Sequence, residues 1–192
     1  MELKKMAIIQ SGYISRFKIE PREDGTHFLL QARDIDAERF TYKADNLVRF
    51  SPDLSRKDWI LKTNDVLFMS RGTRNYSILI KEIPDRVLAA ACFFIVRLSS
   101  DQVLPDYLCW YLNQPQVEHY LSRHSGRGVH MPVVRRSVLE NINIPIPPIE
   151  VQVKITKLDV LLQNEMELLD KLAGKRKKLI TAACLHAVQN NS

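Results

Sequence analysis

Apolar residues follow two different patterns along the chain. Up to about residue 148, short runs rich in β-branched or aromatic residues alternate with turn residues, as in the strands of a small sheet. The runs expected to form strands are 6–9, 27–31, 59–62, 66–69, 76–80 and 87–98. Two short helices are expected to follow. The first begins near Pro105, because a first helical turn tolerates proline, and the second runs from near Pro115 to the glycines of segment 125–128.

The pattern becomes purely helical after about residue 150. Apolar residues recur at alternating spacings of three and four, which is a near-heptad repeat interrupted at Glu165 and Arg176. This stripe consists of Val151, Ile155, Leu158, Leu162, Leu169, Leu172 and Leu179. A single long helix cannot bury such a stripe by itself, so the pattern predicts a partner helix. Gly174 is expected to mark a bend or a close crossing.

The boundary between the two patterns is the sequence IPIPP at 144–148. Its three prolines hold the chain extended and cannot donate backbone hydrogen bonds. The sequence therefore predicts a domain at 1–148 and a helix at 149–192.

Composition is that of an ordinary globular protein with a basic excess. The 28 lysines and arginines against 22 acidic residues give a formal charge of +6, which favours an acidic partner such as nucleic acid. No apolar run approaches the roughly 20 residues of a membrane span, and the short N-terminal apolar stretch does not suit a secretory signal, so a cytoplasmic protein is expected. Cys92, Cys109 and Cys184 are predicted to be reduced core thiols.

Several segments resemble a known family. The segment 141–152, NINIPIPPIEVQ, is similar to the hinge that closes each target recognition domain in the specificity subunits of Type I restriction-modification systems. That family's spacer helix is resembled by the basic run 175–179 and by four residues before it, Ile155, Leu158, Asp159 and Leu162. Weaker similarities occur in the family's order at 30–35 (LQARDI), at 62–67 with 70–72, and at Ser125-Gly126 with Leu139. Val151 and Asn64 depart from the usual motifs. A complete member has two recognition domains and two helices, whereas this chain has one of each.

The resemblance implies an α+β fold, with a mixed, curled sheet and flanking helices followed by one long coiled-coil-type helix. It implies a target recognition domain at 1–148 and a spacer and dimerisation helix at 149–192. The expected function is to bind a half-site in double-stranded DNA and to scaffold a modification (methyltransferase) subunit, with a restriction subunit as a further option. A homodimer with antiparallel helices is expected.

The residues themselves argue against catalysis. The sequence has no Asn-Pro-Pro-aromatic or Asp-Pro-Pro-aromatic tetrapeptide and no glycine-rich loop for an adenosyl cofactor. It has no nuclease motif with paired acidic groups. His119, His124 and His130 lack a carboxylate or thiol at ligand spacing, so no metal site is predicted. The chain is expected to be non-catalytic and to need no cofactor.

Arginine-bearing loops are the features suited to DNA. Guanidinium groups pair bidentately with guanine, and asparagine pairs with adenine. The residues expected to contact DNA are Arg16, Lys18, Arg71, Thr73, Arg74, Asn75, Tyr76, Arg127, His130, Arg135 and Arg136. For each, the alternative is a solvated surface residue. The lysine-rich stretch 171–178 is expected to be a solvated helix face, with a phosphate-binding patch as the alternative.

Three other functions fit the same sequence. The chain could be a stand-alone recognition domain acting in trans for another DNA methyltransferase or phage-defence enzyme. It could be a coiled-coil adaptor that binds only protein, or an enzyme of an unfamiliar kind. Salt-dependent DNA binding would separate the adaptor from the others, because neutralising several phosphates makes affinity fall steeply with salt.

Overall fold

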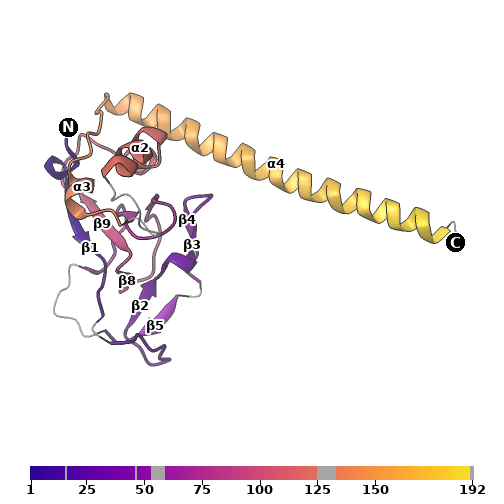
Figure 1. Ribbon diagram of the computed structural model, residues 1–192, viewed down its shortest axis with the longest axis horizontal. Helices are drawn as coiled ribbons and strands as arrows, with labels where there is room; N and C mark the ends of the chain where they lie inside the picture. Colours follow the sequence, from indigo (N-terminus) through magenta and orange to yellow (C-terminus); the bar gives the residue numbers. More distant parts are fainter. Residues whose placement is uncertain (16, 46, 53–58, 125–132, 191–192) are drawn as a thin grey trace. The chain divides into compact units, whose positions relative to one another are not determined.

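The computed structural model describes residues 1–15, 17–45, 47–52, 59–124 and 133–190. These residues form two units, Met1–Val153 and Lys154–Ser192 (Figure 1).

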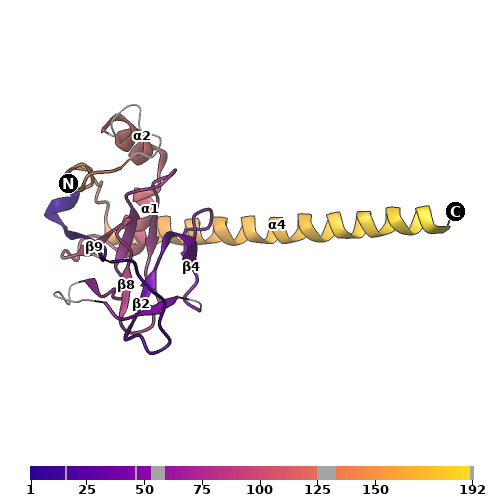
Figure 2. The same cartoon turned by 60° about the horizontal axis from the view of Figure 1, so that its bottom comes forward.

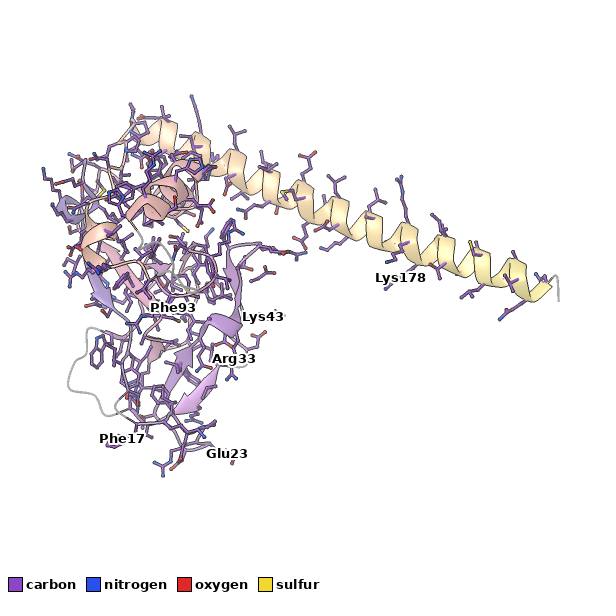
Figure 3. The ribbon with its side chains drawn as sticks, in the orientation of Figure 1. Phe17, Glu23, Arg33, Lys43, Phe93 and Lys178 are labelled. Atoms are coloured by element: carbon purple, nitrogen blue, oxygen red, sulfur yellow. The ribbon has the colours of Figure 1, made fainter. Side chains whose placement is uncertain are left out.

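A four-stranded antiparallel sheet organises the first unit. Its strands lie in the order β1 (Ala7–Ser11), β9 (Phe93–Leu98), β6 (Val66–Met69) and β7 (Ser77–Leu79). Ala7 pairs with Leu98, and Val66 pairs with both Val96 and Leu79. All four residues of β6 are buried, because this central strand is covered on both faces. Phe93 lies among the packed side chains in Figure 3 and is fully buried.

Two smaller sheets complete the strands. One has the order β5 (Val48–Phe50), β2 (His27–Leu30) and β8 (Val87–Ala89), with β2 parallel to β8. The other is a hairpin of β3 (Ile35–Asp36) and β4 (Thr41–Tyr42). Figure 2 shows β2 and β8 beside one another and β4 at the edge of the unit.

Short helices flank the sheets, and one long helix follows. They are the 3-10 turns η1 (Leu3–Lys5) and η2 (Ala32–Asp34), and the helices α1 (Pro105–Leu112), α2 (Pro115–His124), α3 (Arg136–Glu140) and α4 (Ile149–Asn190). The helix α1 packs on β7. Directly after α1, the side chain of Asn113 accepts a hydrogen bond from the Ser77 N–H at 2.7 Å and donates one to the Ser77 carbonyl at 2.9 Å. These small sheets, flanking helices and long C-terminal helix confirm the expected α+β class.

Several sequence-based expectations were wrong in detail. The run 87–98 is two strands, because the chain passes from one sheet to the other at residues 90–92. Within 59–62, Ile60 makes only an isolated bridge to Leu88. The strands β3, β4 and β5 and the helix α3 were not expected. Cys184 is exposed on α4 rather than in a core, whereas Cys109 is buried.

The helix α4 continues through Gly174 without interruption. Its stripe residues from Leu158 to Leu179 are all about half exposed or more, between 46% and 71%. Among the described residues, no helix is both long and apolar enough to cross a membrane.

Candidate nucleic-acid interface

The segment between β6 and β7 forms a closed loop with two exposed arginines. We call residues 71–75 the arginine loop. The Asn75 side-chain amide donates to the Met69 carbonyl at 2.8 Å, and the Met69 N–H donates to the Tyr76 carbonyl at 2.8 Å. These bonds fix the base of the loop and leave Arg71, Thr73 and Arg74 exposed.

Two residues predicted to contact DNA have structural positions instead. Tyr76 is 5% exposed and belongs to the main core, so its ring is not on the surface of the loop. Burial, with the nearby Cys92, raises the pKa of Tyr76 to about 12. The Asn75 amide nitrogen is occupied by the Met69 carbonyl. The arginine loop therefore presents two guanidinium groups and one hydroxyl rather than the five groups expected.

The β3–β4 hairpin packs against the arginine loop. The Arg74 guanidinium carbon lies over the Phe40 ring, 5.7 Å from its centroid, which is a cation–π geometry. Phe40 has a positive φ of 52°, in the hairpin turn. The Asp36 side chain stabilises this turn, because its Oδ1 accepts from the N–H groups of Glu38 and Arg39 at 3.1 Å each. The contact joins two surface elements that are distant in sequence.

The hairpin and η2 add three exposed cations that sequence reasoning missed: Arg33, Arg39 and Lys43. Figure 3 shows Arg33 and Lys43 on the same side of the unit. Asp34 fixes η2 by accepting the Gln31 N–H at 2.8 Å. One signal was available, since Arg33 lies within the motif LQARDI that was singled out for its family resemblance.

Cys92 connects η2 to the arginine loop. Burial raises the pKa of its thiol, while a backbone hydrogen bond at Ala32 and the charge of Arg71 act in the opposite direction. The Cys92 carbonyl also accepts the N–H of Ser70, the residue before Arg71, at 2.8 Å. We call the exposed cations of η2 and the hairpin, together with those of the arginine loop that contacts the hairpin, the basic face; they are Arg33, Arg39, Lys43, Arg71 and Arg74. Arg33 and Arg39 each lie 3.9 Å from a neighbouring carboxylate, of Asp34 and Asp36, which offsets part of their charge.

The segment before α3 also meets the arginine loop. Val133 forms a bridge with Arg71, and the Val134 N–H donates to the Ser70 carbonyl at 2.9 Å. Arg127 and His130 of the preceding segment lie outside the described residues, as does Arg16. Arg135 is exposed, two residues beyond Val133. Arg136 is paired with Glu140 at 2.7 Å, which neutralises part of its charge.

Lys18 is not part of the basic face. It lines a separate cavity of about 570 Å³, together with Tyr13, Phe17, Phe50 and Trp59. In Figure 3, Phe17 lies at the lower end of the unit, well apart from Arg33 and Lys43.

The family is established by comparison with known proteins. Residues 3–172 match the family model described as the Type I restriction modification DNA specificity domain. The chain belongs to this family. The specificity subunit of the Type I restriction enzyme MjaVIII from Methanocaldococcus jannaschii is 27% identical over 148 residues, which cover 73% of this chain and 33% of that protein.

Solved structures show the same fold. The HsdS subunit from Thermoanaerobacter tengcongensis gives a TM-score of 0.60 at 18% identity, covering 89% of this chain and 38% of that one. A chain solved to explain complex assembly and conformational transition of the type I R-M system gives 0.61 at 18% identity, covering 88% and 39%. The type I S subunit from M. genitalium gives 0.54 at 13% identity, covering 90% and 40%. This specificity domain therefore spans about a third of the curated relative and about two fifths of each solved chain.

The histidines of this specificity domain do not form a ligand cluster in the described part of the chain. No group of three His, Cys, Asp or Glu side chains there is arranged to hold a metal ion. His119 is exposed on α2, and the His124 ring lies against Tyr120 with centroids 4.2 Å apart.

Proposed function

We propose that this chain is a DNA-recognition subunit of a Type I restriction-modification system, and that the basic face binds one half-site. The observation that carries the proposal is the packing of Arg74 in the arginine loop against Phe40 in the β3–β4 hairpin, which joins two surface segments that both carry exposed cations. Duplex DNA is a polyanion, and such a surface gains affinity by displacing its counterions. Residues 1–148 form the target recognition domain.

Within this face, Arg71 and Arg74 read base edges. They extend from one closed loop, and guanidinium groups make bidentate pairs with guanine in the major groove. Arg33, Arg39 and Lys43 bind phosphates and set the register of the domain on the duplex. The ring of Phe40 holds Arg74 in place and so reduces the entropy lost when the arginine binds.

Residues 149–192 form the spacer and dimerisation helix. Two copies of α4 pair antiparallel and bury the stripe. The resulting dimer has two recognition domains and two helices, as a complete member of the family does. The antiparallel arrangement sets the basic run 175–178 of one chain near the acidic region of Asp159 and Glu165 in the other, whereas parallel copies would bring lysines together. The DNA target is then an inverted repeat with a fixed gap.

The apolar surface of α4 is wider than one two-helix seam. Leu161, Met166 and Leu168 flank the stripe and are 63%, 59% and 66% exposed. Positions beside a coiled-coil seam stay largely in water in a two-stranded pair. We therefore propose that helices of a modification subunit cover these flanks, and that the methyltransferase and restriction subunits supply the chemistry while this chain is not catalytic.

Binding to matched DNA tests the proposal. A half-site selected from a random duplex library is compared with random duplex of equal length. Arg71→Ala and Arg74→Ala are expected to weaken binding to the selected site by about 1–3 kcal/mol per base contact, and binding to random DNA by less. Arg74→Lys retains the charge but not the bidentate geometry, so it should lose selectivity too.

Arg22→Ala is the matched control, because Arg22 is also an exposed arginine and precedes Glu23 in the sequence. Figure 3 shows Glu23 at the lower end of the unit, apart from Arg33 and Lys43. The Arg22→Ala substitution should leave selectivity unchanged. Equal losses on both DNAs would make the loop a phosphate anchor. Unchanged binding by both loop variants would overturn the proposed interface.

A further inference from the structure

The linker that leads into α4 is fastened to the recognition domain along its whole length. Before the prolines, the Leu3 N–H donates to the Ile142 carbonyl at 2.9 Å, and the Ile144 N–H donates to the Met1 carbonyl at 2.8 Å. Further on, the Tyr107 hydroxyl of α1 donates to the Pro145 carbonyl at 3.0 Å. The prolines restrict the backbone, and these bonds hold it in one place.

Gln152 completes this attachment in the first turn of α4. It is 0% exposed, and it is the one buried residue in the described part of that helix. Its Oε1 accepts from the Leu104 N–H at 2.9 Å, while its Nε2 donates to the carbonyls of Gln102 and Pro147 at 2.8 Å each. One amide therefore ties together the helix, the linker and the segment that enters α1.

A buried amide defines an orientation more strictly than an apolar contact does. Apolar side chains can slide against each other at little cost, whereas a displaced Gln152 would leave buried donors and acceptors without partners. The helix α4 continues from this turn for 42 residues in total, about 60 Å at 1.5 Å per residue. A small change of angle at the first turn therefore becomes a large displacement at the far end.

We propose that Gln152 is a positioning residue that fixes the joint between the recognition domain and α4, and thereby sets the single gap length accepted between two half-sites. The inference rests on the proposed paired architecture. Adding one base pair to the gap moves the second half-site by about 3.4 Å and turns it by about 35°, since a turn of DNA takes 10–10.5 base pairs. A rigid joint cannot adjust to both the shift and the rotation of the second half-site, whereas a loosened joint can.

The experiment measures binding of the full chain to duplexes that carry two inverted half-sites with gaps lengthened or shortened by one and two base pairs. The wild-type protein should prefer one gap by roughly tenfold or more, within the range that linked sites reach. Gln152→Met keeps the side-chain length but removes all three hydrogen bonds. It should reduce this preference to below about threefold while leaving single half-site binding within about twofold.

Gln163→Met is the matched control. Gln163 lies on the same helix, and its side-chain amide donates to the Asp159 carboxylate at 2.9 Å. The Gln163→Met protein should keep the gap preference of the wild type. A Gln152→Met protein that discriminates between gaps as sharply as the wild type overturns the inference alone. A wild-type protein without any gap preference overturns the paired architecture, and the inference with it.

Gln152→Glu provides a second variant with a reversible defect. In its ionised form, the new side chain would face the carbonyl oxygens of Gln102 and Pro147, which repel a carboxylate. When it is protonated, the same carboxyl group can donate a hydrogen bond to one of them. Because burial raises the pKa of a carboxyl group, gap preference should be lost at high pH and recovered in part at low pH. Circular dichroism and half-site binding report folding. If neither variant folds, Gln152 is a folding requirement rather than a residue that sets the gap, and the inference fails.

Discussion

The double substitution Leu162→Lys and Leu169→Lys tests whether α4 pairs with a second copy. Both leucines belong to the stripe and are 54% and 57% exposed. Lysine is also a good helix former, so each change removes apolar surface from the stripe without breaking the helix.

The exposed fractions of Leu162 and Leu169 determine how much free energy of dimerisation the double substitution can remove. Full burial of a leucine contributes about 1.5–3 kcal/mol, so burying the exposed half of each contributes about 0.8–1.5 kcal/mol. Each leucine occurs twice in a dimer with twofold symmetry. The double variant should therefore weaken dimerisation by about 3–6 kcal/mol, which raises the dissociation constant by roughly two to four powers of ten. Lysine can extend its charge to water, which favours the lower end of this range.

Sedimentation equilibrium over a range of protein concentrations measures the dissociation constants. The matched control is Val160→Lys with Leu185→Lys, because these apolar residues are 47% and 60% exposed but lie away from the stripe on α4. The control should remain a dimer. The stripe variant should be a folded monomer that no longer prefers bipartite DNA. A wild-type protein that is monomeric at tens of micromolar would refute self-pairing and would favour a different half-subunit as the partner.

Two further predictions concern the core of the recognition domain. Asp65 is 1% exposed and accepts two hydrogen bonds from Arg97, at 2.7 and 2.6 Å, so Asp65→Asn should lower the free energy of unfolding in urea by about 3 kcal/mol or more. Lys81→Ala, which removes an exposed pair with Asp106 at 3.3 Å, should cost less than about 1 kcal/mol; similar losses for both would contradict this account. Burial raises the pKa of Tyr76 from 10.0 to about 12, so the folded state resists ionisation of the phenol. Stability should fall as the pH rises from 10.0 to about 12, and Tyr76→Phe should flatten that fall; an unchanged slope would remove Tyr76 as its cause.

Periodicity explains which elements were predictable. The helix α4 was expected because its apolar spacing persists over many turns, and α1 was expected because Pro105 stands at its first position. The strands β3 and β4 have two residues each, which is too short for any alternation to appear. The break between β8 and β9 was hidden because residues 87–96 are apolar throughout, whichever sheet they join.

The candidate interface was predictable in part. Arg71 and Arg74 were found because they stand together in one polar loop. Phe40 supports Arg74 from a segment more than thirty residues away, and no local pattern reveals such a contact. The position of Tyr76 was foreseeable, however. It shares one side of a strand pattern with Ile78 and Ile80, and all three belong to the buried core.

The pairing of distant segments also determines when this protein can fold during its synthesis. Ala7 of β1 has no strand partner until Leu98 has been made, and the Leu3 N–H has no acceptor until Ile142 has followed. Such non-local pairing is slow, because long loops must close before any contact forms. The helix α4, by contrast, is built from local hydrogen bonds and can form within microseconds once it has left the ribosome. Because the described strands β1 to β9 end at Leu98, they are all synthesised before the stripe of α4 appears, so the recognition domain can begin to fold before α4 is able to pair.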